Sequence, residues 1–247
     1  MIKSPSSTAV ITERYRVRLA ASAADLRAAQ RLRFHVFNLE LHEGLVDSHL
    51  TGLDCDPFDA VCAHLVVEER ETNTVVGTYR LQTGASAKDH LGYYSEQEFD
   101  FSPFEGERQR ILELGRACVA AEHRNQLVLG LLWRGILNYA RDRGLRFLLG
   151  CSSLSSQDEA GAIVTYQGLA ARFLVAERWR TLPVHACRCQ RGPAEPLAVP
   201  RLMVAYLSAG SRICGEPAID REFGTIDFLT LMDLESVSPR FARKYLA

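Results

Sequence analysis

Residues 111–151 constrain the fold of this 247-residue chain more than any other segment. A short apolar run at 111–119 is followed by a polar turn and then by a helical pattern over 127–143, which Gly144 ends. A second apolar run of strand length occupies 147–151. Strand, helix and strand in this order predict a βαβ crossover, in which the two strands lie parallel beside each other.

Gly115 interrupts the first of these strands, between Glu113 and Arg116. Glycine inside a strand is unfavourable unless a bulge or a close backbone approach needs it. In a regular strand the two charged side chains point to opposite faces. An extra bulge residue at Gly115 would bring them to one face and splay the strand from its parallel neighbour. The pattern fits either a structural glycine between two edge charges or a cleft that holds a linear ligand against exposed backbone.

The other segments predict a mixed α/β fold with an antiparallel first half and one βαβ unit. Alternation predicts a half-buried strand at 14–19, and a capping box at 22–25 opens a helix to about residue 39. The remaining predicted elements are a hairpin of strands 61–69 and 75–82, helices 156–177, 200–210 and 239–245, and strands 182–189 and 225–233.

Composition sets the broad class of protein. Hydrophobic residues make up 47% of the chain and charged residues 24%, the balance of a globular protein with a real core. A net charge of −1 gives no nucleic-acid signature. Seven cysteines at irregular spacings indicate a reducing compartment. With no apolar run of membrane length and no secretory signal pattern, we expect a cytoplasmic protein. We expect a flexible tail at 1–13 and a single domain at 14–247.

Arg33 falls near the middle of the apolar arc of the first predicted helix, beside Phe37 on the helical wheel. A buried arginine is costly without a carboxylate partner or an anionic ligand. Alternatively, its side chain extends along the apolar surface to solvent. Arg80 is similarly placed inside a predicted strand. The sequence therefore contains two arginines whose surroundings demand an explanation.

Asp54, Asp56 and Asp59 lie close together in the loop after the first helix. Such a cluster fits a metal site, turn chemistry or a set of partners for arginines. The segment 83–109 is partly aromatic, which fits either a mobile cover over an apolar ligand or ordinary packing. His185, Cys187 and Cys189 form an H-x-C-x-C pattern that fits a metal site, but no fourth ligand stands nearby and no second ligand pair has zinc-site spacing, so we expect no metal.

Together these residues resemble the acyl-transferring branch of the GNAT superfamily, which includes acyl-homoserine-lactone synthases, N-acyl amino acid synthases and ornithine N-acyltransferases. The resemblance runs from about Tyr15 to the C-terminus. Arg33 with Phe37 resembles the Arg/Phe pair of that branch, and Arg80 its strand arginine. Its D-x-x-D and E-x-x-R motifs match Asp56-Pro57-Phe58-Asp59 and Glu113-Leu114-Gly115-Arg116. Residues 113–154 and 213–218 look closer to the ornithine acyltransferases.

The resemblance implies a GNAT-like α/β (α+β) fold, with a mostly antiparallel sheet, a splayed central parallel pair and flanking helices. It also implies an N-acyltransferase that moves a long-chain acyl group, 3-hydroxylated in one version, from a thioester to the α-amine of an amino acid. Ornithine is the first choice of acceptor, giving a lyso-ornithine lipid. No cofactor or metal is implied. The implied catalytic residues are Glu113 and Arg116, and the implied substrate-binding residues are Arg33, Phe37, Asp56, Asp59, Arg80, Ala117, Cys118 and Val119.

The expected donor follows from a departure from the superfamily pattern. GNAT enzymes that use coenzyme A carry a Q/R-x-x-G-x-G/A turn, whose backbone N–H groups bind pyrophosphate. Here residues 124–129 lack those glycines, which favours an acyl carrier protein, because its phosphopantetheine arm has no pyrophosphate. Carrier proteins are acidic, so a basic docking patch is expected. Candidate docking residues are Arg124, Arg141, Arg143, Arg146 and Arg172.

Three alternatives remain open on the sequence. In the first, the acceptor is glycine or another amino acid. In the second, the chain is an acyl-homoserine-lactone synthase that uses S-adenosylmethionine. The third alternative is a non-catalytic module that binds acyl lipids or a carrier protein. A lipid product also implies transient contact with the cytoplasmic face of the membrane.

Overall fold

The computed structural model describes residues 10–246, in which nine strands form one sheet. The order of the main path is β1-β2-β3-β4-β5-β6-β9-β7, and β8 also pairs with β9. Every pair is antiparallel except β5 and β6, as predicted. The strands are β1 (Val10–Ile11), β2 (Tyr15–Leu19), β3 (Ala63–Glu69), β4 (Thr74–Thr83), β5 (Ile111–Val119), β6 (Phe147–Leu154), β7 (Arg212–Ile213), β8 (Ala218–Asp220) and β9 (Thr225–Asp233).

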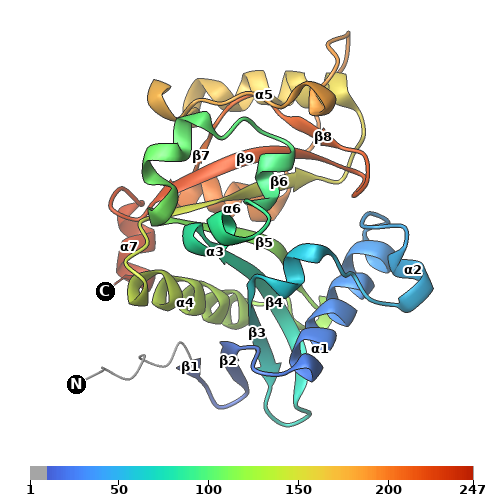
Figure 1. Cartoon of the computed structure of the whole chain (residues 1–247), viewed down its shortest axis with the longest axis vertical. Helices are drawn as coiled ribbons and strands as arrows, with labels where there is room; N and C mark the ends of the chain where they lie inside the picture. Colours follow the sequence, from blue (N-terminus) through green and yellow to red (C-terminus); the bar gives the residue numbers. More distant parts are fainter. Residues whose placement is uncertain (1–9, 247) are drawn as a thin grey trace.

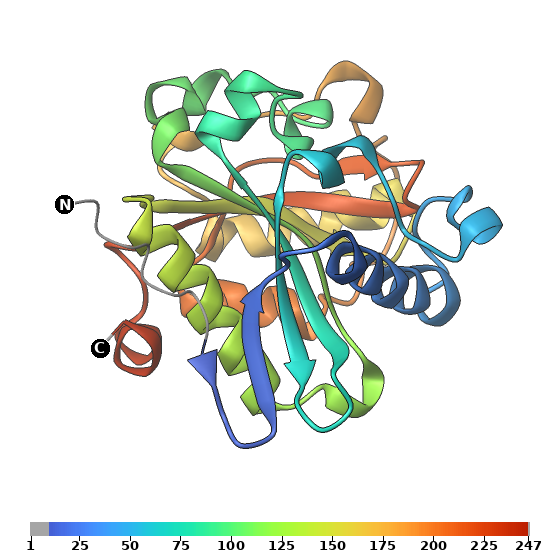
Figure 2. The same ribbon diagram turned by 60° about the horizontal axis from the view of Figure 1, so that its bottom comes forward.

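Helices cover both faces of the sheet. Figure 2 shows α1 and α4 on either side of the strands β2–β4, and Figure 1 shows α5 over the half of the sheet that contains β9. The α-helices are α1 (Ala23–Phe34), α2 (Ser48–Thr51), α3 (Gly84–Asp89), α4 (Gln126–Asp142), α5 (Glu159–Phe173), α6 (Arg201–Ala209) and α7 (Pro239–Tyr245). A π-helix, His35–Glu40, continues α1, and 3₁₀ helices occupy Pro57–Ala60, Tyr94–Gln97, Ser102–Arg110, Ala121–His123, Glu177–Trp179 and His185–Cys187.

The parallel pair β5–β6 separates partway along its length. The pairing runs only from Ile111–Phe147 to Glu113–Leu149. Beyond this point β5 stays paired with β4 and β6 with β9. At Gly150 an added Cβ would lie 2.2 Å from the Leu114 carbonyl oxygen, so the close approach at the point of separation requires glycine. The predicted splay of the central strands is present.

The bulge in β5 lies one residue later than predicted. Thr78 pairs with Cys118 and Arg80 with Gly115, so β5 has one residue more than β4 between these pairs. Arg116 has φ +50°, in the left-handed region, and is the bulged residue rather than Gly115. This conformation costs a non-glycine residue roughly 1–3 kcal/mol. The ion pairs of the Arg116 guanidinium, described below, hold it there.

The two faces of the sheet differ in character. Asn125 caps the N-terminus of α4, and its side chain accepts hydrogen bonds from the N–H groups of Leu127 and Val128. The buried side chains of α4 pack with those of β2, β3 and β4 in the largest apolar core. Alternation along β4 places Tyr79 on this face and Arg80 on the other, which faces α1. The site described below therefore joins a polar face to an apolar one.

The aromatic segment before β5 is part of the core rather than a cover. Tyr93, Phe99, Phe101 and Phe104 are buried in a cluster with Phe147 and Leu149. The offset and tilted ring contacts among these side chains are those of ordinary aromatic packing. The interpretation of this segment as a mobile ligand cover is therefore wrong for these four rings.

The predicted N-terminal tail is partly a strand. Val10 and Ile11 pair with Val17 and Arg16, and Thr12 closes the turn by hydrogen bonds with Tyr15. Residues 1–9 of the predicted tail lie outside the described residues. Among residues 10–246, no helix has both the length and the apolar character needed to cross a membrane.

Candidate active site

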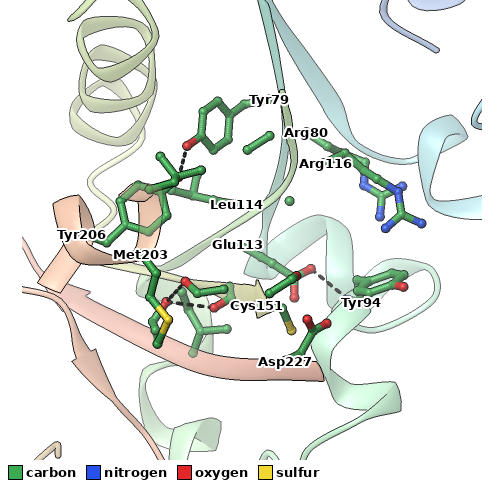
Figure 3. Close-up of a pocket in the computed structure, with 18 of the residues that line it drawn as sticks. Tyr79, Arg80, Tyr94, Glu113, Leu114, Arg116, Cys151, Met203, Tyr206 and Asp227 are labelled. Atoms are coloured by element: carbon green, nitrogen blue, oxygen red, sulfur yellow. Dashed lines mark hydrogen bonds between the residues drawn. The ribbon is translucent and has the colours of Figure 1, made fainter. Parts of the chain in front are cut away.

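A cavity of about 340 Å³ runs through the gap where β5 and β6 separate. It connects the α1 face of the sheet with the α4 face. The polar lining includes Glu43, Arg80, Gln82, Tyr94, Glu113, Arg116, Cys151, Asp220 and Asp227. The apolar lining includes Tyr79, Leu114, Trp133, Leu148, Met203, Tyr206 and Met232. Figure 3 shows Tyr79, Tyr206 and Met203 at one end of the cavity and Tyr94 with Arg116 at the other.

Glu113 lies at the point of strand separation, on the polar side. It is 5% exposed and pairs with Gln82 of β4 and Leu149 of β6. Its carboxylate accepts hydrogen bonds from Tyr94 N at 2.8 Å, from Ser95 N at 2.9 Å and from the Ser95 hydroxyl. Burial raises the pKa of Glu113, and the hydrogen bonds from Ser95 and Tyr94 oppose that shift. Among the described residues Glu113 forms no ion pair with Arg116 or Arg33, whose ion-pair partners are aspartates.

Three arginines and three aspartates form one ion-pair network on the α1 side of the cavity. Arg33 is fully buried, and its Nη2 lies 2.6 Å from Asp59 Oδ2. Arg80 contacts Asp56 at 2.6 Å and Asp59 at 3.1 Å, and Arg116 contacts Asp56 at 2.9 Å. Asp54 lies 3.6 Å from Arg33 and 3.5 Å from Arg116. The formal charges of the six side chains sum to zero, which makes their burial tolerable.

Local sequence explains how the aspartates reach the arginines. Asp56 caps the 3₁₀ helix Pro57–Ala60, its side chain accepting a hydrogen bond from Phe58 N at 2.9 Å. Proline in the first turn fixes the direction of the chain, and Asp59 then faces Arg33. Burial opposes ionisation of Asp56, but Arg80 and Arg116 hold its pKa below the usual range. Of the three alternatives for the acid cluster, these contacts fit two: the aspartates are partners for arginines, and Asp56 also caps a turn.

Arg80 and Arg116 also contact aromatic rings and line the cavity. The Arg116 guanidinium carbon lies 4.4 Å from the centroid of Phe223 and 4.9 Å from that of Tyr94. Phe37 lines the cavity and meets Phe223 edge to face, with ring centroids 5.3 Å apart. Arg33 does not line the cavity. Among the described residues its polar partners are the carboxylates of Asp59 and Asp54 and the carbonyl oxygen of Asp54.

The structure places the side chains of the predicted substrate-binding residues Ala117, Cys118 and Val119 in different surroundings. Ala117 lines the cavity, whereas Cys118 is buried with Leu32 and Phe223 in a small apolar cluster. Val119 packs against the main core. Ala120 N donates to Val76 O, so alternation along β5 turns the N–H of Val119 away from β4 toward the open side.

A second polar cluster lies opposite the arginines and was not predicted from the sequence: Cys151, Asp220 and Asp227 line the cavity, and Glu98 lies beside them. Glu98, Cys151 and Asp227 place one ligand atom each within 4.8 Å of one another. Asp220 lies near them and accepts hydrogen bonds from the Tyr94 hydroxyl and Phe223 N. These residues come from separate segments, β6, β8, β9 and the loop before β5, so no local spacing announces them. Burial raises the pKa of Asp227 to about 6 and raises that of Glu98.

The five predicted docking arginines do not form one patch. Arg124 precedes α4, at the end of β5 where the gap is open, and pairs with Glu40. Arg141 and Arg143 lie at the other end of this 17-residue helix, about 25 Å away. Arg146 pairs there with Asp233 at 2.7 Å, and Arg172 occupies the last turn of α5. Only Arg124 of this set lies where a donor entering the open gap would meet it.

Comparisons with known proteins agree with this geometry. A family model described as an acetyltransferase (GNAT) domain matches residues 32–134. The chain is 33% identical over 252 residues to an L-ornithine N(alpha)-acyltransferase of Brucella abortus, covering 93% of this chain and 88% of the relative. It is 32% identical to a second protein of that name from Rhodobacter capsulatus, with 94% of each chain covered.

Solved structures show the same fold at low identity. FeeM, an N-acyl amino acid synthase from uncultured soil microbes, matches with a TM-score of 0.55 and 13% identity, covering 95% of this chain and 97% of FeeM. MesI, a CoA-dependent acyl-homoserine lactone synthase, matches with a TM-score of 0.53 and 14% identity, covering 92% of each chain. The GNAT-like fold and the acyltransferase class predicted from the motifs are confirmed. The chain belongs to the family of the L-ornithine N(alpha)-acyltransferases.

Proposed function

We propose that this chain transfers a long-chain acyl group from the thioester of an acyl carrier protein to the α-amine of L-ornithine, giving a lyso-ornithine lipid. The observation that carries the proposal is the cavity through the sheet, whose polar and apolar halves meet where β5 and β6 separate. An amino acid suits the polar half and a fatty chain the apolar half. The name of the relatives supports ornithine as the acceptor.

In the proposed reaction the α-amine attacks the thioester carbonyl at the point of separation. Glu113 takes a proton from the α-ammonium through a water molecule, because an ammonium has no lone pair. The backbone N–H groups near Ala117–Val119 polarise the carbonyl, and Arg116 binds the acceptor carboxylate. The C–N bond forms as the C–S bond breaks, and the thiolate leaves and takes up a proton. The proposal is supported by the positions of Glu113, Arg116 and Ala117, which all line the cavity.

The carrier-protein donor is favoured by the N-terminus of α4. Asn125 Oδ1 accepts hydrogen bonds from Leu127 N and Val128 N, each at 3.0 Å. In a coenzyme A site these N–H groups would be free to bind pyrophosphate. Here the helix supplies its own acceptor, so a pyrophosphate would have to displace the Asn125 side chain. A phosphopantetheine arm makes no such demand.

The apolar half of the cavity also contains two hydroxyl groups, which support a 3-hydroxylated acyl chain as the proposed substrate. The hydroxyl groups of Tyr79 and Tyr206 hydrogen-bond each other among Trp133, Met203 and Met232. We expect this pair to hydrogen-bond a 3-hydroxyl group on the acyl chain. The lipid product also implies transient contact with the membrane surface, and the exposed Val46 and Leu50 lie shortly after the cavity-lining Glu43.

The test is product formation by the purified protein. A long-chain acyl carrier protein and the matching acyl-CoA are each incubated with L-ornithine, glycine and S-adenosylmethionine, and products are identified by mass spectrometry. We expect N-acyl ornithine with the carrier protein as the better donor. Acyl-homoserine lactone, N-acyl glycine as the main product, or no turnover with any pair would each contradict the proposal. The last outcome would favour a binding module.

A further inference from the structure

Carboxylates without a cationic partner gather in and beside the polar half of the cavity, where Glu113, Asp220 and Asp227 form part of the lining and Glu98 lies next to Asp227. Within residues 10–246, Glu98, Glu113, Asp220 and Asp227 form no ion pair with lysine, arginine or histidine, whereas the neighbouring Arg/Asp network is neutral. Glu98 is 4% exposed and Asp227 3%. Buried carboxylates in such numbers repel one another unless protons or a bound cation neutralise them.

Unused hydrogen-bond acceptors give a second, independent observation. Among the described residues, Oδ1 of Asp227, Oε1 of Gln82 and Oε2 of Glu43 are buried without a hydrogen-bond partner, and all three side chains line the cavity. The orientation of the Gln82 amide is fixed, because its nitrogen donates to Gly92 O at 2.8 Å. Buried acceptors without donors are rare in folded proteins. The unpaired acceptors therefore favour a ligand that carries several N–H donors.

The acceptors lie at two levels along the strands. At the point of separation Glu113 pairs with Gln82 on one side and with Leu149 on the other. Cys151, which contacts Glu98 at 3.7 Å, lies two residues farther along β6, a rise of about 7 Å. Figure 3 shows Glu113 between the arginines and the side of the cavity that holds Cys151 and Asp227. The α- and δ-ammonium groups of ornithine are separated by the α-carbon and three methylene groups. An extended chain of this length matches the distance between the two levels.

We propose that Asp227 and Glu98 bind the δ-ammonium group of the acceptor and make the enzyme selective for a basic amino acid, while the α-amine lies beside Gln82 and Glu113. This inference rests on the proposed function for the position of the α-amine. Asp220 adds a third carboxylate near the δ-ammonium group, and the unused Oδ1 of Asp227 can accept one of the three ammonium protons. The binding of the ammonium offsets the repulsion among the carboxylates.

The test compares L-ornithine with L-norvaline, which has the same carbon chain but no δ-amine. In the wild type we expect kcat/KM to favour ornithine by ~10²-fold or more, the cost of leaving buried charges unpaired. In Asp227→Asn and in Glu98→Gln we expect this ratio to fall by at least ~10-fold. Asp89→Asn, which removes an exposed acid, is the matched control and should keep the wild-type ratio. Equal losses for both substrates, leaving the ratio unchanged, would overturn the inference.

Binding of 1,4-diaminobutane, measured by calorimetry, tests the site without turnover. We expect binding to the wild type and a loss of at least ~10-fold in affinity in Asp227→Asn. Diamine binding that is lost in the variant supports the inference even if N-acyl ornithine is not the product, so the two proposals fail separately. Activity that disappears with a chelator and returns with a divalent ion would overturn the inference, because Glu98, Cys151 and Asp227 would then hold a metal.

Discussion

Arg33 is fully buried, and Asp59 provides its closest carboxylate partner. Removing that partner leaves an uncompensated charge in the interior. We expect Asp59→Asn to lower the free energy of unfolding by ~3–5 kcal/mol. Urea unfolding followed by circular dichroism measures this change. Glu107→Gln breaks the more exposed pair with Arg110 and should cost about 0–1 kcal/mol. Similar values for the two variants would show that the network does not stabilise the fold.

Glu113 has two separable roles in our description. It anchors the turn at Tyr94 and Ser95, and it is the proposed base. In Glu113→Gln the amide nitrogen faces N–H donors, so we expect a loss of ~1–3 kcal/mol in stability. Turnover should fall by ~10²–10⁴-fold because general-base assistance is lost. Melting temperature and kcat are measured on the same preparation. A folded variant with near wild-type turnover would remove Glu113 from catalysis and leave it as an anchor.

At the scale of single elements, the separation of β5 from β6 predicts where the acyl donor docks. We expect it at the N-terminal end of α4. The gap opens toward Arg124, and Arg143 lies at the closed end. We expect Arg124→Glu to raise the KM for the acyl carrier protein by ~10-fold at low salt, because an acidic partner is then repelled. Added salt should weaken carrier binding in the wild type. A larger effect of Arg143→Glu would instead place docking at the closed end.

The elements whose patterns are local were predictable from the sequence. The βαβ unit follows from apolar periodicity and Gly144, and the start of α1 from Ser22, which accepts a hydrogen bond from Asp25 N. The position of the bulge was not predictable, because the left-handed conformation of Arg116 depends on Asp54 and Asp56, about 60 residues earlier.

The two polar clusters of the site also differ in how far they could be predicted from the sequence. The Arg/Asp network was visible as residues in unfavourable places, since a buried arginine or a charge inside a strand signals a missing partner. The second acid cluster has no such signature. Asp227 reads as a polar position in an alternating strand, and only the pairing of β9 with β6 brings it beside Cys151 and Glu98. Long-range pairing of this kind leaves no trace in a short window of sequence.

For the whole molecule, the buried acids predict how stability varies with pH. Burial raises the pKa of Asp227 to about 6, and Glu98, Asp220, Cys151 and Glu43 face the same space. An unfolded carboxyl titrates near pH ~4, so the folded protein binds more protons than the unfolded one between about pH 4 and 6. The free energy of unfolding should therefore fall as pH rises through this window. Urea titrations across it should show a shallower fall in Asp227→Asn, whereas Asp89→Asn should keep the wild-type slope.

The gap between β5 and β6 has a consequence for how the product departs. The proposed amide would have its head group on the α1 face and its tail on the α4 face, threaded through a wall of hydrogen-bonded backbone. Neither end passes easily to the other face, so the product has to slide sideways through the open edge of the wall. We expect this exit, rather than bond formation, to limit turnover. Rapid-quench experiments should then show a burst of about one product per enzyme before the steady state. The absence of a burst would show that bond formation is slower than product release.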